Sequence, residues 1–213
     1  MFLGELQSLL NGVYALDLSY DIYDFLITDA GLAHALDAGG RHADEKLLIA
    51  EDSGEAEVCL YLEAELVDRL TRNNPATCLN DANLEDFWTA FEGVSHFTYY
   101  AWNAMLEKPV SLLEMELQAE VDKFIVTSLL LRQQGERSPQ GLHHWLFELP
   151  KLDSRLDDEE HERYRRANRY AGRYCRKLAP ELARGFGDGD LRRELRRFYR
   201  FSQPAKIRHI ESG

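Results

Sequence analysis

The chain has 213 residues and a formal net charge of −12, from 25 lysines and arginines against 37 aspartates and glutamates. Hydrophobic residues make up 45% of the chain and charged residues 29%, which excludes a disordered chain, a collagen and a coiled-coil fibre. At roughly 150 residues per domain, this length fits one domain or two small ones. No stretch reaches about 18 uncharged apolar residues, so we expect no membrane insertion.

The cysteines and the first residues of the chain indicate the cellular compartment of the protein. The three cysteines (Cys59, Cys78 and Cys175) are odd in number and lack CxxC spacing, which excludes a disulfide framework and a zinc ribbon. Residues 1–6 contain Glu5 and no basic residue, which argues against a signal peptide. We therefore expect a cytoplasmic protein.

Charge is divided unevenly along the chain. Residues 1–160 contain 10 basic and 31 acidic residues, a net charge of −21, whereas residues 161–213 contain 15 and 6, a net charge of +9. Such asymmetry predicts that the basic segment docks on the acidic body, within one chain or between copies, or that it contacts an anionic partner. Docking on the acidic body is the simpler interpretation.

The N-terminal part combines helical and strand patterns. The clearest is a β-hairpin, in which strand-like runs at 46–51 and 57–62 flank the turn-forming residues 52–55. The other expected elements are a helix over 2–16, a strand over 20–28, a helix that Asp29 caps and that ends before Gly39-Gly40, and a helix over 63–72.

The remainder of the chain reads as helical. Asn83 is expected to cap a helix over 84–107, Pro109 to end it, and Ser111 with Glu114 to form a capping box at the next helix. These two helices should form a helical hairpin. The further expected elements are a helix to about Gln134, an apolar segment at 143–147, a helix over 158–178 ended near Pro180, a loop at 185–189, a helix over 190–200 and a frayed tail.

These elements predict an α+β fold, with a small N-terminal β element that contains a hairpin, followed by a predominantly helical body. The expected division is an αβ segment at 1–75 and a helical body with basic C-terminal helices at 76–213, and the two could form one continuous domain. The absence of βαβ alternation argues against a doubly wound fold.

Carboxylates on the helix that begins at Ser111 are the most informative candidates for a site. Glu120 falls within the apolar stripe of this helix and Glu116 lies one turn before it. A carboxylate on an apolar face must be paired, protonated or bound to metal. The preceding helix offers Glu92 and His96, also one turn apart, and facing helices that supply Glu and His build metal sites in bundles.

Glu92, His96, Glu116 and Glu120 are therefore the candidate metal ligands, and Glu116, Glu120 and His96 are the candidate acid–base residues. The Glu-x-x-x-His spacing differs from the Glu-x-x-His of di-iron bundles. The alternative is a buried ion pair of the carboxylates with Lys123 or with an arginine of the C-terminal helices. For His96 alone, an interfacial histidine held by hydrogen bonds is the simpler interpretation. The pair His143-His144 is expected to anchor its own segment on the core.

Arginines and aromatic residues alternate in the C-terminal helices. Guanidinium groups beside aromatic rings can bind RNA or single-stranded DNA, by clamping phosphates and stacking on bases. The same spacing also fits solvated arginines that flank an apolar stripe. The candidate residues for an anionic partner are Arg165, Arg166, Arg169, Arg173, Arg193, Arg196 and Arg197.

No motif in the chain defines a reaction. The function predicted from the sequence is a cytoplasmic protein-interaction or accessory, regulatory module without its own catalysis, bound to a protein partner or to a second copy. One alternative is a metal-dependent enzyme that uses the carboxylates and His96, and the other is binding of RNA or single-stranded DNA. No cofactor is named by the sequence, and we expect none.

Overall fold

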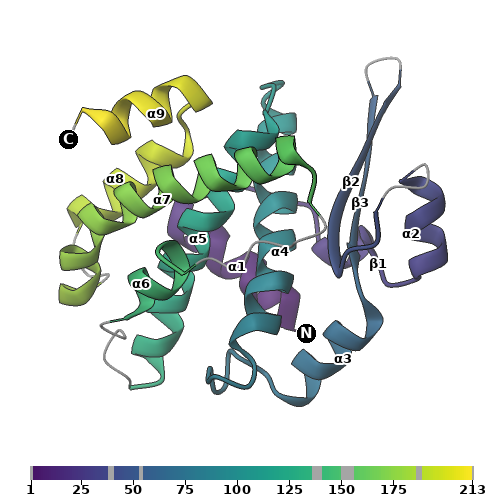
Figure 1. Ribbon diagram of the computed structural model, residues 1–213, viewed down its shortest axis with the longest axis horizontal. Coiled ribbons are helices and arrows are strands. Elements are labelled where there is room, and N and C mark those ends of the chain that lie inside the picture. Colours follow the sequence, from purple (N-terminus) through teal and green to yellow (C-terminus); the bar gives the residue numbers. More distant parts are fainter. Residues whose placement is uncertain are drawn as a thin grey trace.

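The computed structural model describes residues 2–37, 41–52, 55–135, 141–149, 156–185 and 189–212. A small sheet near the N-terminus precedes a helical body, so the α+β class predicted from the sequence is confirmed (Figure 1). Among the helices that it describes, none is long and apolar enough to cross a membrane. The elements are α1 (Phe2–Tyr14), η1 (Ile22–Asp24), β1 (Leu26–Ile27), α2 (Ala30–Leu36), β2 (Glu45–Asp52), β3 (Glu55–Leu62), α3 (Ala64–Arg72), α4 (Leu84–Met105), α5 (Leu112–Gln133), α6 (Leu142–Phe147), α7 (Asp158–Arg184), α8 (Gly189–Tyr199) and α9 (Gln203–Glu211).

The sheet has the strand order β1-β3-β2. The predicted hairpin is confirmed: β2 and β3 pair antiparallel with Glu45 opposite Leu62, and β1 adds in parallel to β3. Leu60 and Leu62 are fully buried. The sheet stands beside α4, and α2 lies on its far side (Figure 1). This arrangement brings the start of β2 against the middle of α4.

The strand predicted over 20–28 is wrong for most of its length. Ile22 to Asp24 form a 3₁₀-helix, and only Leu26 and Ile27 pair with β3. The backbone N–H of Ile22 donates to Gln7 Oε1 at 3.1 Å, and the Asp21 carboxylate accepts from the N–H of Tyr23. These backbone N–H groups therefore donate to side-chain oxygens and not to a neighbouring strand. The side-chain hydrogen bonds outweigh the β-propensity of the segment.

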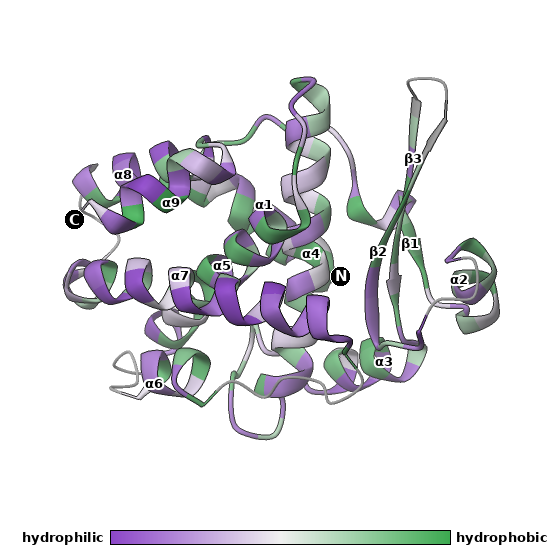
Figure 2. Cartoon of the chain, turned by 45° about the horizontal axis from the view of Figure 1, so that its top comes forward, coloured by the Kyte–Doolittle hydropathy of each residue, from purple (hydrophilic) through white to green (hydrophobic). Residues whose placement is uncertain are grey.

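The helical body is built around α5. The predicted hairpin of α4 and α5 around Pro109 is confirmed, and α5 lies between α4 and α7 with nearly all of its residues buried (Figure 1). By contrast α7 is largely hydrophilic along its outer side (Figure 2). The helix α5 is therefore the centre of the core, and its polar residues must find partners inside the protein.

Two of the expected helix caps differ from the prediction. The Ser111 hydroxyl accepts from the N–H of Glu114 at 3.1 Å, which is one half of a capping box. The Glu114 carboxylate instead accepts from the Tyr99 hydroxyl at 2.5 Å and from the N–H of Gln203 at 3.0 Å, at the start of α9. Asn83 makes no side-chain cap to α4, because its Oδ1 accepts instead from the N–H of Asn80 in the preceding loop at 2.9 Å.

The C-terminal part is more helical than predicted. Helix α7 continues through Pro180 to Arg184, because Leu182 extends its buried stripe and this burial outweighs the hydrogen bond that proline removes. The expected frayed tail is helix α9. Lys206 and Ile210, one turn apart, are 0% and 3% exposed and hold α9 on the core.

Lys206 belongs to a buried polar network on α5. Its ammonium group donates to Gln118 Oε1 and lies 4.5 Å from the centre of the Tyr99 ring. Gln118 donates in turn to Asp122 Oδ1 at 2.7 Å. Asp122 is fully buried and accepts further hydrogen bonds from the hydroxyls of Tyr14 and Ser95. The network ties α1, α4, α5 and α9 together.

Close packing of α4 on the sheet depends on Gly93. A Cβ atom at this position would lie 2.8 Å from both Glu45 Cγ and Leu60 Cδ1, so Gly93→Ala must displace a neighbour. Overpacking should outweigh the better helix propensity and lower the free energy of unfolding by about 1 kcal/mol in urea denaturation. In the matched Gly12→Ala in α1, the added Cβ has no atom within 4 Å, so this substitution should raise the free energy of unfolding. Equal effects of the two substitutions would contradict this packing.

Candidate functional site

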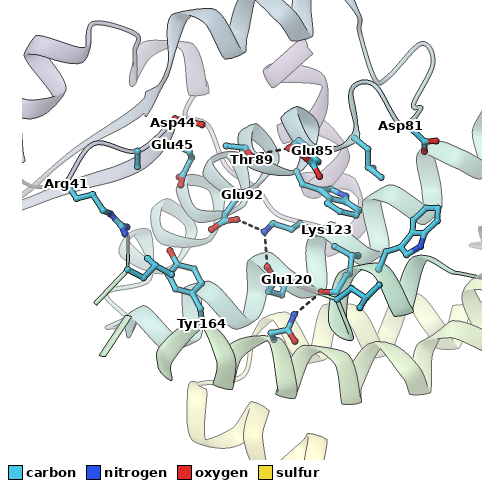
Figure 3. Close-up of a pocket in the computed structure, with 18 residues that line it drawn as sticks. Arg41, Asp44, Glu45, Asp81, Glu85, Thr89, Glu92, Glu120, Lys123 and Tyr164 are labelled. Carbon is cyan, nitrogen blue, oxygen red and sulfur yellow. Dashed lines mark hydrogen bonds and ion pairs between the residues drawn. The ribbon is translucent and has the colours of Figure 1, made fainter. Parts of the chain in front are cut away.

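The candidate carboxylates and histidine meet between α4, α5 and the sheet. Glu92 and His96 on α4 face Glu116 and Glu120 on α5. The structure adds Glu45, at the start of β2, which the sequence analysis missed (Figure 3). We call Glu45, Glu92, His96, Glu116, Glu120, Lys123 and Arg163 the acidic cluster.

His96 lies between two carboxylates. Its Nδ1 is 3.6 Å from Glu45 Oε1, and its Nε2 is 3.4 Å from Glu116 Oε2. The side chain of His96 is only 7% exposed, yet Nε2 and Glu45 Oε1 have no hydrogen-bond partner among the residues that the structure describes. Buried polar atoms are almost always hydrogen-bonded, so Glu45 Oε1, on the Nδ1 side of the ring, marks a place where a further atom is expected. His96 Nε2 faces Glu116 instead.

Three donor groups are close enough to share an ion. One donor atom each from Glu45, Glu92 and His96 lie within 4.8 Å of one another. A metal ion with bonds of about 2.1 Å holds its donors roughly 3.3 Å apart, so rotations of the side chains can close the site. Imidazole suits zinc and iron and carboxylates suit manganese, so this mixed set of donors fits each of these divalent ions.

Lys123 forms the ion pairs that were the alternative to a metal site. Its ammonium group contacts Glu92 Oε2 and lies 2.8 Å from Glu120 Oε1 (Figure 3). Burial alone would lower the pKa of Lys123, but the charges of Glu120 and Glu92 outweigh it and raise this pKa. Lys123 is therefore a permanent cation. A carboxylate has two oxygens, so the contact to Oε2 leaves Glu92 a second donor atom.

The acidic cluster carries excess negative charge. Arg163 on α7 lies 3.9 Å from Glu116 and is, after Lys123, the second cation of the acidic cluster. Two cations against four carboxylates leave two negative charges uncompensated while His96 is neutral. Burial raises the pKa of Glu45. Burial would lower the pKa of His96, but Glu116 and Glu45 raise it well above its ordinary value. Each shift reports a demand for positive charge, which a divalent cation would meet.

The acidic cluster forms part of the wall of a cavity of about 730 Å³. This volume is typical of sites for small molecules. Glu45, Glu92, Glu120, Lys123 and Tyr164 lie together toward one end (Figure 3). Glu45 and Glu92 line the cavity and His96 does not, but its donor atom lies within 4.8 Å of theirs, so an ion held by all three would be reached from the cavity.

The paired histidines do not converge on an ion. His143 Nε2 lies 2.8 Å from the carbonyl of Gly172, and His144 Nδ1 lies 2.9 Å from Glu148 Oε2. His143 therefore anchors α6 on α7. The loop expected at 185–189 is described only at its two ends, because residues 186–188 lie outside the described part of the chain.

The candidate arginines are spread over α7 and α8 rather than gathered at one point. Arg196 donates to the carbonyl of Val13, and Arg200 donates to the carbonyls of Tyr14 and Ala15, so both cap the end of α1. Arg165 and Arg193 form exposed ion pairs within their own helices. Arg169 and Arg197 lie over aromatic rings, and Arg173 is exposed. Arg166 is half-buried.

Comparison of the chain with protein-family models, with curated proteins and with solved structures finds no match. Function is therefore argued from the acidic cluster and its cavity.

Proposed function

We propose that the protein binds one divalent transition-metal ion through Glu45, Glu92 and His96 and acts with it on a small molecule in the adjoining cavity. The observation that carries this proposal is Glu45 Oε1, a buried carboxylate oxygen that faces His96 Nδ1 and has no hydrogen-bond partner among the described residues, in a cluster whose three donors lie within 4.8 Å. This corresponds to the metal-dependent enzyme that the sequence offers as an alternative.

Six of the seven residues of the acidic cluster have a role in this proposal. His96 binds the ion through Nδ1, the nitrogen that faces Glu45, and its Nε2–H turns toward Glu116. A carboxylate behind a ligating imidazole fixes its orientation and raises its basicity. When bound, the ion would supply Lewis-acid chemistry: it would polarise a substrate oxygen or lower the pKa of a water bound to it. Lys123 holds Glu92 and Glu120 in place.

Titration with Mn²⁺ and with Zn²⁺, followed by isothermal titration calorimetry, tests the proposal. The wild-type chain should bind one ion, and Glu45→Gln should weaken its affinity at least about tenfold, since one charged ligand is lost. His96→Ala should weaken it similarly. Glu162→Gln is a matched control, because this carboxylate is 58% exposed on α7 and should leave the affinity unchanged. Absence of binding, or equal affinities in all four chains, refutes the proposal.

Two other functions stay predictions: a protein-interaction module, and binding of RNA or single-stranded DNA. Both rest on the basic C-terminal segment. The bonds from Arg196 and Arg200 to the end of α1 favour docking within the chain for that part of the segment. An external anionic partner would use the remaining arginines, and its affinity should then fall steeply with salt.

A further inference from the structure

We infer that the small molecule in this cavity is an organic cation, an ammonium group joined to an apolar body. The inference rests on the proposed function where it concerns the reaction of this molecule. Binding of the molecule depends only on the residues that line the cavity. Charge, aromatic surface and spacing along α4 each support it.

The charge of the cavity excludes an anionic ligand. Among the lining residues that the structure describes, the only basic side chains are Arg41 and Lys123. Both are already used, because Arg41 lies 3.4 Å from Glu160 and Lys123 holds two carboxylates. Against them stand the six acidic residues Asp44, Glu45, Asp81, Glu85, Glu92 and Glu120. Glu85 has a partner of its own, so the other five carboxylates exceed the two basic side chains by three negative charges. A bound divalent ion would offset two of these charges, so the cavity still favours a cation.

The other part of the cavity wall is apolar and aromatic. Trp88 from α4 and Trp145 from α6 both line it, together with Leu84 and Leu149. The indole N–H of Trp88 donates to the Thr127 hydroxyl at 3.0 Å, which fixes its ring before any ligand binds. Trp145 is 46% exposed, although it is a large apolar side chain. Indole rings attract cations to their faces, more strongly than other aromatic side chains do.

The spacing along α4 places the acidic and aromatic groups in one row. Glu85, Trp88, Thr89 and Glu92 recur every three or four residues and share the face that lines the cavity. The eight residues from Glu85 to Glu92 are separated by seven rises of 1.5 Å and span roughly 10 Å. Asp81 lies at the end of the cavity opposite to Arg41 (Figure 3). The ammonium group would bind near Asp81 and Glu85 and against the indole rings, and the apolar body would extend along the cavity toward the acidic cluster.

Three probes of one shape test this inference on the full chain, with a chelator present. They are 4-phenylbutylamine, which is cationic at neutral pH, 4-phenyl-1-butanol, which is neutral, and 4-phenylbutyrate, which is anionic. Calorimetry should show the amine binding about tenfold more tightly than the alcohol, and no binding of the carboxylate. Because the chelator removes metal, failure here and failure of the metal titration are separate results.

A charge-matched pair of variants locates the effect. Asp81→Asn with Glu85→Gln should abolish the preference for the amine over the alcohol. Glu65→Gln with Asp68→Asn removes the same charge from the exposed side of α3 and should preserve it. The inference is overturned if the amine does not bind at millimolar concentration, if the alcohol or the carboxylate binds as tightly, or if both variants behave alike.

Discussion

Lys123→Met is expected to lower the free energy of unfolding by about 3–5 kcal/mol, as measured by urea denaturation of the metal-free protein. The substitution leaves Glu92 and Glu120 buried without their shared cation. An uncompensated buried charge costs far more than the net contribution of the intact pair, because desolvation is no longer offset by attraction.

The triple variant Lys123→Met, Glu92→Gln, Glu120→Gln is the control for this effect. It removes the cation and both carboxylates together, so it should recover most of the lost stability. Lys123→Met alone should also bind Mn²⁺ more tightly than the wild-type chain, because Glu92 no longer shares its charge with an ammonium group. A single variant as stable as the triple variant would show that the ion pairs do not determine stability here.

The second large effect is a change in pH dependence on replacing Lys206. Burial lowers the pKa of Lys206 to about 7, although Glu114 and Asp122 raise it. Between pH 7 and the ordinary lysine pKa of about 10.4, Lys206 is protonated in the unfolded chain and neutral in the folded chain. The unfolded chain therefore binds one proton more than the folded chain. Stability therefore rises with pH in this interval, by about 3 kcal/mol between pH 7 and pH 9.5. In Lys206→Met this contribution should be absent.

Urea denaturation at several pH values measures the difference in slope between the two chains. Comparing the chains cancels groups that titrate in both, and Lys108→Met, which removes an exposed ammonium group, should keep the wild-type slope. Asp122 titrates lower, because burial raises its pKa to about 6 against hydrogen bonds from Ser95, Tyr14 and Gln118, which lower it. Parallel curves for the wild type and Lys206→Met would mean that Lys206 folds without losing its proton.

Five of the seven residues of the acidic cluster could be predicted from the sequence. Glu92 with His96, and Glu116 with Glu120, are each one turn apart, so helical periodicity places each pair on one face. The ion pair of Glu120 with Lys123 follows from the same periodicity. Glu45 could not be found in this way, because its position depends on how closely the sheet packs on α4 at Gly93. That contact is tertiary and leaves no local pattern.

The buried polar network escaped the sequence analysis for a different reason. Helix α5 is buried on nearly all sides, so its hydrophobic pattern has no polar face against which Asp122 or Gln118 would stand out. Lys206 lies in a segment whose composition resembles a frayed tail, and α9 forms because its side chains reach this network. The hairpins, in contrast, were predictable because turn residues and short-range periodicity define them.

Anomalous diffraction from crystals soaked in Mn²⁺ shows whether Glu45, Glu92 and His96 bind a metal ion. One strong peak is expected, with the donor atoms of these three residues about 2.0–2.3 Å from it and with Glu116 hydrogen-bonded to His96. The same soak of Glu45→Gln should show this peak weakened or lost. Density at the acidic cluster that is unchanged by Mn²⁺, with Lys123 and Arg163 as its sole cations, would contradict the proposed metal site.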